Sequence, residues 1–182
     1  WQILAVDQVS PSQACAQFED IRQRLERAAA ETVEPFARLA LQLTPDQLDN
    51  LKKQQAESNE EFEKDFLRGS PERRLNKRLD KAVERSESFY GKLNPEQREL
   101  LRGWLQQSPF DPQRTQAERL RRQADLLQTI RDAQATPAKA EQLVREHIAR
   151  IRQSPEPGYN AYSQALVRQG CAQFATLHNA TT

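Results

Sequence analysis

A pentapeptide that occurs twice constrains the fold of this chain more than any other feature. Leu43-Thr44-Pro45-Asp46-Gln47 returns 50 residues later as Leu93-Asn94-Pro95-Glu96-Gln97. In each copy the Thr or Asn side chain can accept a hydrogen bond from a free backbone N–H, and the proline suits the first helical position. The glutamine can reach back to the cap. Because eight of the ten prolines follow Ser, Thr, Asn or Asp, we expect helices that begin at prolines along the whole chain.

Apolar residues spaced three and four apart follow most of these starts, as one face of a helix requires. The first predicted helix would bury a stripe that includes Phe18, Ile21 and Leu25. Pro35 interrupts this pattern, so the apolar residues after it follow a kink or form a separate short turn. No segment shows the alternation of a strand. We therefore expect an all-α fold: an elongated bundle of six to seven amphipathic helices with short proline-initiated connections and no sheet, forming a single domain over residues 1–182.

Composition narrows the classes of function. Lysine plus arginine total 27 and aspartate plus glutamate total 26, so the chain lacks the positive field that draws proteins onto nucleic acid. Only 37% of residues are hydrophobic, which suits slender amphipathic helices better than a thick core. No window approaches the roughly 20 apolar residues of a transmembrane helix, and no charged start with an apolar run marks a signal peptide.

The two cysteines, Cys15 and Cys171, lie near opposite ends of the sequence. They cannot form a metal motif alone, because structural sites usually need four clustered ligands. In the cytosol they would be buried thiols. In an oxidising compartment they could instead close a very long loop, for which the chain-entropy model gives about 4 to 5 kcal/mol of stabilisation.

Signatures of catalysis are absent from the sequence. It has no glycine-rich phosphate loop, no G-x-S-x-G elbow, no H-E-x-x-H and no C-x-x-C. The two histidines lie in different predicted helices. His147 falls on an apolar stripe, so we expect a half-buried histidine with a hydrogen-bond partner rather than a metal ligand. We expect no enzyme, no cofactor, no metal site and no small-molecule substrate.

Two groups of charged residues differ in their expected roles. Between residues 72 and 87 basic and acidic side chains interleave, which is typical of a mixed-charge helix face in solvent. Arg119, Arg121 and Arg122 have fewer acidic neighbours. An anionic lipid head group or an acidic partner could contact them.

Aromatic residues stand directly at two predicted helix ends, in Phe89-Tyr90-Gly91 and in Ser108-Pro109-Phe110-Asp111. They can act as hydrophobic staples or as plugs between helices. They can also serve as aromatic contacts for a partner protein. His178-Asn179 closes the last predicted helix and has the same two interpretations, although Asn is a good helix terminator.

At these residues the chain resembles the uncharacterised helical lipoproteins of proteobacteria, a family known only as a domain of unknown function. The resemblance runs from about Cys15 to Thr182, and it depends on the order and spacing of several short motifs rather than on one of them. These motifs are the two pentapeptides, Ser58-Asn59 with Phe62, Phe89-Tyr90-Gly91, Ser108 to Asp111, Arg121-Arg122-Gln123 with Asp125 and Leu126, and Leu177-His178-Asn179 before Thr181-Thr182.

The resemblance implies an exported protein that faces the periplasm and is tethered by a lipid on a segment this sequence lacks. Residues 1–182 would be a fragment of a longer precursor, without its lipidated N-terminal segment and a C-terminal helix. That compartment favours the Cys15–Cys171 disulfide. The resemblance supplies no catalytic residues.

Our leading hypothesis is a non-enzymatic envelope protein, a structural or interaction module that binds another envelope protein or a membrane-associated complex. The alternative is a periplasmic holdase-type chaperone, since stress chaperones of that compartment carry two L-T-x-x-Q motifs. Here Asn94 replaces Thr in the second copy, and helix capping alone explains both copies. The candidate partner-contact residues are Asn59, Phe89, Tyr90, Phe110, Asp111, Arg121, Arg122, His178 and Asn179.

Overall fold

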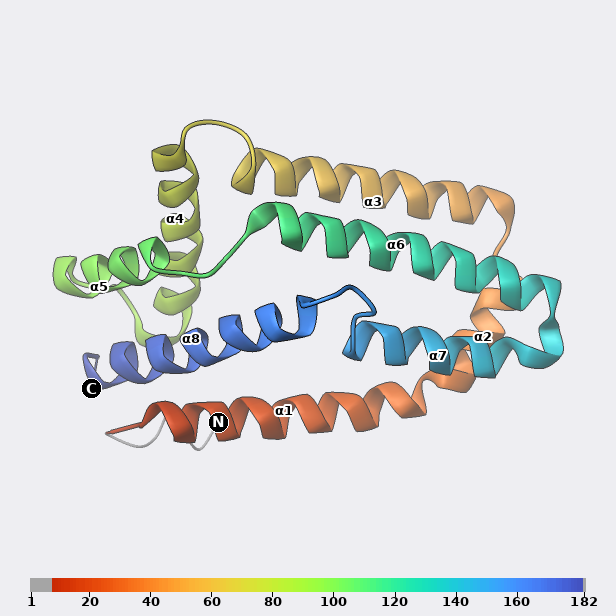
Figure 1. The fold of residues 1–182 in the computed structure, drawn as a ribbon, viewed down its shortest axis with the longest axis horizontal. Coiled ribbons are helices and arrows are strands. Elements are labelled where there is room, and N and C mark those ends of the chain that lie inside the picture. Colours follow the sequence, from red (N-terminus) through yellow and green to blue (C-terminus); the bar gives the residue numbers. More distant parts are fainter. Residues whose placement is uncertain (1–7, 182) are drawn as a thin grey trace. The chain divides into compact units, whose positions relative to one another are not determined.

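The computed structural model describes residues 8–181, and this part of the chain is all-α with no strand (Figure 1). The prediction of a helical bundle without a sheet is confirmed for these residues. The α-helices are α1 (Pro11–Glu31), α2 (Val33–Gln42), α3 (Pro45–Phe66), α4 (Pro71–Tyr90), α5 (Pro95–Gln106), α6 (Pro112–Ala135), α7 (Ala140–Arg152) and α8 (Tyr159–Asn179), with a short 3-10 helix, η2 (Pro137–Lys139), before α7.

The described residues thus form eight α-helices, one more than the upper limit of the prediction. The difference arises at α2, which is a complete helix rather than a turn or the continuation of a kinked helix. Helix α1 stops at Glu31, and Thr32 turns back so that its hydroxyl donates to Ala29 O at 2.8 Å. Pro35 then lies in the first turn of α2, where a missing N–H removes no intrahelical hydrogen bond.

Three of the described helices, α1, α3 and α5, begin with reciprocal hydrogen bonds between the cap residue and a glutamine three positions later. The backbone N–H of each cap donates to the glutamine side chain at 2.8 to 3.0 Å. The glutamine N–H donates to the cap side chain at 2.9 to 3.3 Å. Both pentapeptides are therefore helix beginnings, as predicted. The pairs are Ser10 with Gln13, Thr44 with Gln47 and Asn94 with Gln97.

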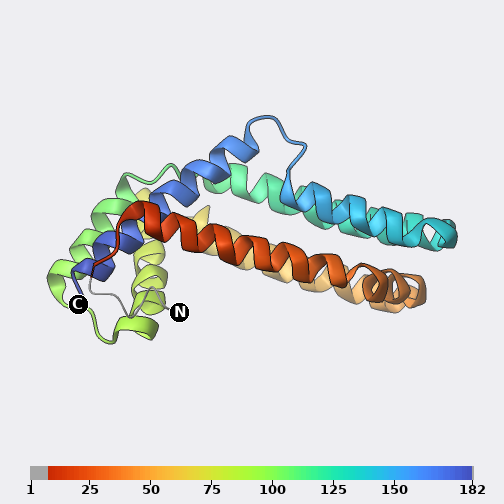
Figure 2. The ribbon, with the colours of Figure 1, turned by 90° about the horizontal axis from the view of Figure 1, so that it is seen from below.

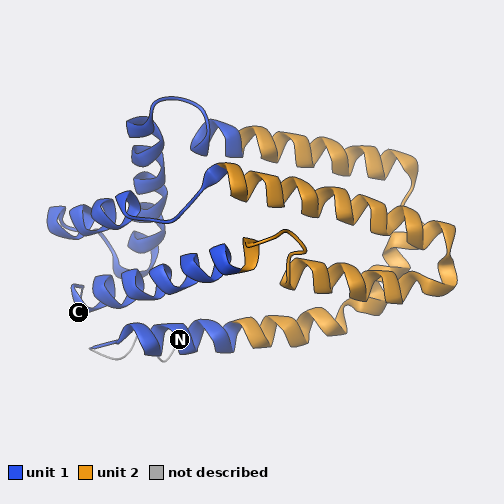
Figure 3. Cartoon of the chain, in the orientation of Figure 1, with its two compact units in different colours: residues 1–21, 62–112, 161–182 blue, residues 22–61, 113–160 orange. Residues whose placement is uncertain are grey.

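Internal contacts divide the chain into two compact units, coloured separately in Figure 3. Unit 1 comprises residues 1–21, 62–112 and 161–182, and unit 2 comprises residues 22–61 and 113–160. Each unit combines segments that are far apart in the sequence. The expectation of one domain over residues 1–182 stays a prediction.

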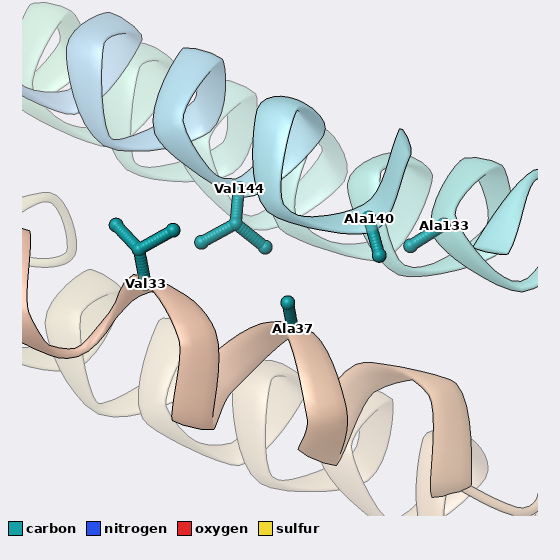
Figure 4. Packing of buried hydrophobic residues seen from close by; sticks show 5 residues of the cluster. All are labelled: Val33, Ala37, Ala133, Ala140 and Val144. Carbon is teal, nitrogen blue, oxygen red and sulfur yellow. The ribbon is translucent and has the colours of Figure 1, made fainter. Parts of the chain in front are cut away.

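The core of unit 2 forms where α2 packs on α7. Val33 and Val144 point toward each other in Figure 4, with Ala37, Ala140 and Ala133 alongside. These small side chains let the helix backbones approach closely and are almost fully buried. Figure 2 shows that α6 and α7 lie antiparallel and side by side within this unit, and η2 connects them.

Unit 1 contains two hydrophobic clusters within the described residues. One gathers Val9 and Ala14 from the start of the chain with Cys171 and Ala175 of α8. The other joins α4 and α5 to the end of α8 through residues that include Val83, Leu93, Leu101 and Leu177. Helix α4 ends before Gly91, whose positive φ of 73° favours glycine.

The predicted buried stripe of α1 is wrong. Phe18, Ile21 and Leu25 have 46%, 54% and 65% of their surface exposed, whereas Ala14, four residues before Phe18 on the same face, is buried and the neighbouring Cys15 is partly buried. Spacing identifies which residues share a helix face, but it does not say which face meets the rest of the protein. Here the face is packed at Ala14, in the cluster around the disulfide, and it is exposed from Phe18 onward.

Candidate functional site

Unit 2 contains a buried carboxylate at the centre of a polar cluster on α6. Glu118 is only 2% exposed. Its two oxygens accept hydrogen bonds from Arg121 Nε and Nη2 at 2.8 and 2.9 Å, from Arg122 Nε at 2.6 Å and from Ser154 Oγ at 2.8 Å. Arg121 Nη2 also donates to Arg150 O at 3.2 Å. The cluster therefore ties α6 to the end of α7 and to the segment that follows it.

These partners determine the pKa of Glu118. Burial alone would raise it, but the hydrogen bonds from Arg121, Arg122 and Ser154 outweigh burial, and together with the charge of Arg121 they lower the pKa to about 2. The hydrogen bond to Glu118 in turn raises the pKa of Arg121. The carboxylate is thus held ionised inside the protein, and it is not available as an acid or a base near neutral pH.

A second polar group lies about two turns beyond Glu118 along α6. The carboxylate of Asp125 accepts from His147 Nδ1 at 2.7 Å and from Arg150 Nε at 2.8 Å, both on α7. The hydroxyl of Thr129 donates to Asp125 O at 2.8 Å. His147 is buried, and it has the hydrogen-bond partner that the sequence predicted. This group holds α7 in register on α6.

Asn59 belongs to a third group, which joins α3 to α6. Its Nδ2 donates to Gln123 Oε1 at 2.8 Å, and its Oδ1 accepts from Gln123 Nε2 at 3.0 Å and from Arg119 Nε at 2.7 Å. Arg119 Nη2 donates to Ser58 Oγ at 2.5 Å. The side chains of Ser58 and Asn59 therefore fix the position of one helix on another.

The candidates Tyr90 and His178 meet in unit 1. Tyr90 Oη lies 3.2 Å from His178 Nδ1 in a hydrogen bond, and the ring of Phe174 stacks on the imidazole at a centroid distance of 5.7 Å. His178 is fully buried. Burial raises the pKa of Tyr90. These residues act as a plug between the end of α4 and the end of α8.

Phe110 and Asp111 are also engaged within unit 1. The ring of Phe110 lies under the guanidinium of Arg78 at 4.7 Å and against the edge of Phe66 at 5.7 Å. Asp111 N donates to Tyr162 Oη at 3.0 Å, and the same hydroxyl donates to Asp111 O at 3.1 Å. Tyr162 thus fixes the backbone of the connection between α5 and α6.

Cys15 and Cys171 form a disulfide, as the resemblance implied, with their Cα atoms 5.2 Å apart. Asn179, at the end of α8, binds both backbone polar groups of Val9. The disulfide and the hydrogen bonds of Asn179 together hold the beginning of α1 to α8. Among the candidates Phe89, at 53%, and Asp111 are exposed.

The structure brings together Arg121 with Arg122, around Glu118, and Tyr90 with His178. It places the other candidates in separate groups. Glu118, Ser154 and Tyr162 were not predicted. For Glu118 a signal existed, because it lies three and four positions before Arg121 and Arg122 on one helix face. Ser154 and Tyr162 carried no comparable signal, since their partners are distant in the sequence.

The buried polar side chains are satisfied by one another rather than directed at an open site. Within residues 8–181 no buried side-chain nitrogen or oxygen lacks a hydrogen-bond partner. In the same range no group of three or more His, Cys, Asp or Glu side chains could hold a metal ion. None of the described helices is long and apolar enough to cross a membrane.

Among models of protein families, that of a family of unknown function, DUF6279, matches residues 2–149. The matched region includes both pentapeptides and Asn59 through Arg122, and it ends before Cys171, His178 and Asn179. No curated protein and no solved structure matches the chain.

Proposed function

The chain belongs to DUF6279, a family of unknown function, and from this premise we propose a non-enzymatic role in the cell envelope. The protein is a helical module that faces the periplasm and binds another envelope protein, as a structural element or as a subunit of a larger assembly. Its surface for that partner is the exposed apolar stripe of α1, formed by Phe18, Ile21 and Leu25.

The stripe is the observation that carries the proposal. Its three side chains follow one another at spacings of three and four on a single helix, and each is about half exposed or more. Covering them would contribute about 1 kcal/mol or more each. An amphipathic helix with its apolar side outward is the form that enters a hydrophobic groove of a partner. We expect such a groove on the partner protein.

The disulfide supports the proposed periplasmic location. Structural disulfides persist in oxidising environments such as the periplasm and are rare in the cytosol. The Cys15–Cys171 bond also holds α1 at its N-terminal end, so it helps to present the stripe. The lipid tether and the proteobacterial origin follow from the resemblance, and they belong to the proposal in the same way.

The engagement of the buried polar groups supports a binding role over an enzymatic one. Catalytic groups are generally found in a cleft with pKa values matched to their reaction. Glu118 instead has a pKa lowered to about 2 by its own neighbours, and Asp125 is occupied by His147 and Arg150.

Site-directed photo-crosslinking in the native host tests the interface. A photoreactive amino acid at Phe18, Ile21 or Leu25 is expected to capture one envelope protein of defined size. Ala30 is exposed on another side of the same helix and serves as the matched control. Absence of a product at all three stripe positions, or equal capture from Ala30, would contradict the proposal.

Two further measurements test the lipid tether and the holdase alternative. Metabolic labelling of the native protein with a palmitate analogue is expected to mark it, and an unlabelled protein would contradict the tether. Prevention of aggregation of several unrelated unfolded proteins at substoichiometric amounts would favour the holdase alternative over a dedicated partner. The expected result is no such effect.

A further inference from the structure

The side of α4 that faces α5 carries a groove with an apolar floor and a charged rim. It is lined by Leu79, Asp80, Val83, Glu84, Glu87 and Arg98. Leu79 and Val83 form the floor and belong to the hydrophobic cluster of unit 1 that includes Leu93 and Leu101. The floor is therefore part of the packed core between α4 and α5.

Two of the basic side chains of α4, Arg78 and Lys81, are engaged with aromatic residues away from the groove. The guanidinium of Arg78 covers the ring of Phe110, and the ammonium of Lys81 pairs with Asp65 at 2.5 Å and lies 5.3 Å from the ring of Phe66. These basic groups thus point to the aromatic residues around Phe110. The acidic residues at positions 80, 84 and 87 line the groove instead.

Two of these carboxylates have no partner in the part of the chain that the structure describes. Glu87 accepts from Arg98 Nη2 at 2.6 Å and from Leu93 N at 3.1 Å. Asp80 and Glu84 form no hydrogen bond or ion pair with any residue in the described range. Their spacing of four places like charges side by side on a helix, an arrangement that destabilises it by a few tenths of a kcal/mol. Local rules are most often broken where a function requires it.

We propose that this groove binds a lysine or arginine side chain from a basic segment of a protein partner. The methylene stem would lie on Leu79 and Val83, and the charged head would pair with Asp80 and Glu84. The groove has a net charge of −2, from three carboxylates and one guanidinium, so electrostatic complementarity selects a cation. The inference deepens the proposed function by naming the chemistry of a partner segment, but it uses no residue of the α1 stripe.

Methyl NMR of the full chain tests the proposal. The probe is a synthetic amphipathic helical peptide with lysines on its polar face, compared with a counterpart that carries glutamate at every lysine position. The lysine peptide is expected to shift the methyl signals of Leu79 and Val83 to saturation, and the glutamate peptide is expected to leave them unchanged.

Substitutions that keep the shape of the side chains identify the binding groups. The double variant Asp80→Asn, Glu84→Gln should weaken peptide binding roughly two- to thirtyfold, the range for two exposed ion pairs. It should fold, since it removes like-charge repulsion. Glu31→Gln, Glu61→Gln removes the same charge at exposed positions outside the groove and should bind as the unmodified chain does.

Several results would overturn the inference: no saturable shift, equal shifts with the glutamate peptide, or equal weakening in both double variants. Magnesium or calcium chloride that shifts the same methyl signals and displaces the peptide at matched ionic strength would identify an inorganic cation site instead. Loss of crosslinking at Phe18 with retained peptide binding would contradict the proposed function and leave the groove intact. Retained crosslinking at Phe18 with loss of peptide binding would contradict the groove and leave the proposed function intact.

Discussion

Asn179 holds the backbone of Val9 with two hydrogen bonds. Its Oδ1 accepts from Val9 N at 2.8 Å, and its Nδ2 donates to Val9 O at 3.1 Å. Val9 is buried in the same hydrophobic cluster as Cys171, the disulfide partner of Cys15. The beginning of α1 is therefore attached to α8 by a polar clamp and by a covalent bond within one cluster.

Asn179→Ala should destabilise the protein by about 1 to 3 kcal/mol, because it leaves the backbone N–H and C=O of Val9 without their partners in a buried cluster. Urea denaturation followed by circular dichroism measures the change. Asn179→Asp is a sharper comparison, since it keeps an acceptor for Val9 N and loses the donor to Val9 O. We expect an intermediate loss, and equal stability of all three proteins would show that the clamp contributes nothing.

Reduction of the Cys15–Cys171 disulfide should lower the free energy of unfolding by about 4 to 5 kcal/mol, because the bond closes a loop across a sequence separation of 156 residues. The measurement compares urea unfolding with and without reductant. In Cys15→Ser, Cys171→Ser the reductant should have no effect, which controls for its action elsewhere. An unchanged midpoint of the native chain would mean that the cluster around Val9 holds α1 without the bond.

Protonation of Glu118 should destabilise the protein at acid pH. Its folded pKa of about 2 lies below the ordinary value of 4.5. For a depressed folded pKa the stabilisation is present above the unfolded value and is lost as pH falls from about 4.5 towards 2. The difference between these two pKa values corresponds to about 3 kcal/mol of folding stability at neutral pH. Measurements of the unfolding free energy across this pH range give the slope of stability against pH.

Glu118→Gln should remove this part of the acid slope and destabilise the protein at pH 7 by about 3 kcal/mol, since Arg121 and Arg122 lose their buried counter-charge. Ser154→Ala removes one of the hydrogen bonds and keeps the carboxylate. It should cost about 1 kcal/mol and preserve most of the slope. A slope that persists in Glu118→Gln would assign the acid sensitivity to other carboxylates.

Local chemistry explains which parts of the fold were predictable. A capping box needs only four consecutive residues, so Thr44 with Gln47 and Asn94 with Gln97 identified helix beginnings correctly. The helix end at Gly91, with its positive φ, is local in the same sense. These signals do not depend on what the helix packs against.

Packing and partner choice depend on residues far apart in the sequence, and here prediction failed. The periodicity of Phe18, Ile21 and Leu25 predicts a shared face, but not that the face is exposed. Arg121 and Arg122 were candidates for contact with a partner or a lipid, and that role stays a prediction. What the sequence did not predict is that both pair with the buried Glu118, which also accepts a hydrogen bond from Ser154, beyond α7. Only the folded arrangement brings that serine to the cluster.

Tyr90 should ionise at unusually high pH. Burial raises its pKa above the ordinary value of 10.0, because the phenolate would lose its hydration. For a raised folded pKa the stabilisation is present below the unfolded value and is lost as pH rises through the folded one. Ultraviolet absorbance titration of the tyrosines is expected to show a component that ionises above pH 10, at which point the protein should begin to lose stability.

Tyr90→Phe tests that assignment, since it keeps the ring that packs near His178 and removes only the hydroxyl, which lies 3.2 Å from His178 Nδ1. The late component should disappear, and stability at pH 7 should fall by about 1 kcal/mol because the imidazole loses a partner. Tyr159→Phe, a change in unit 2, should leave the late component in place. If the component survives in Tyr90→Phe, another tyrosine is the buried one, and the plug between α4 and α8 depends on ring packing alone.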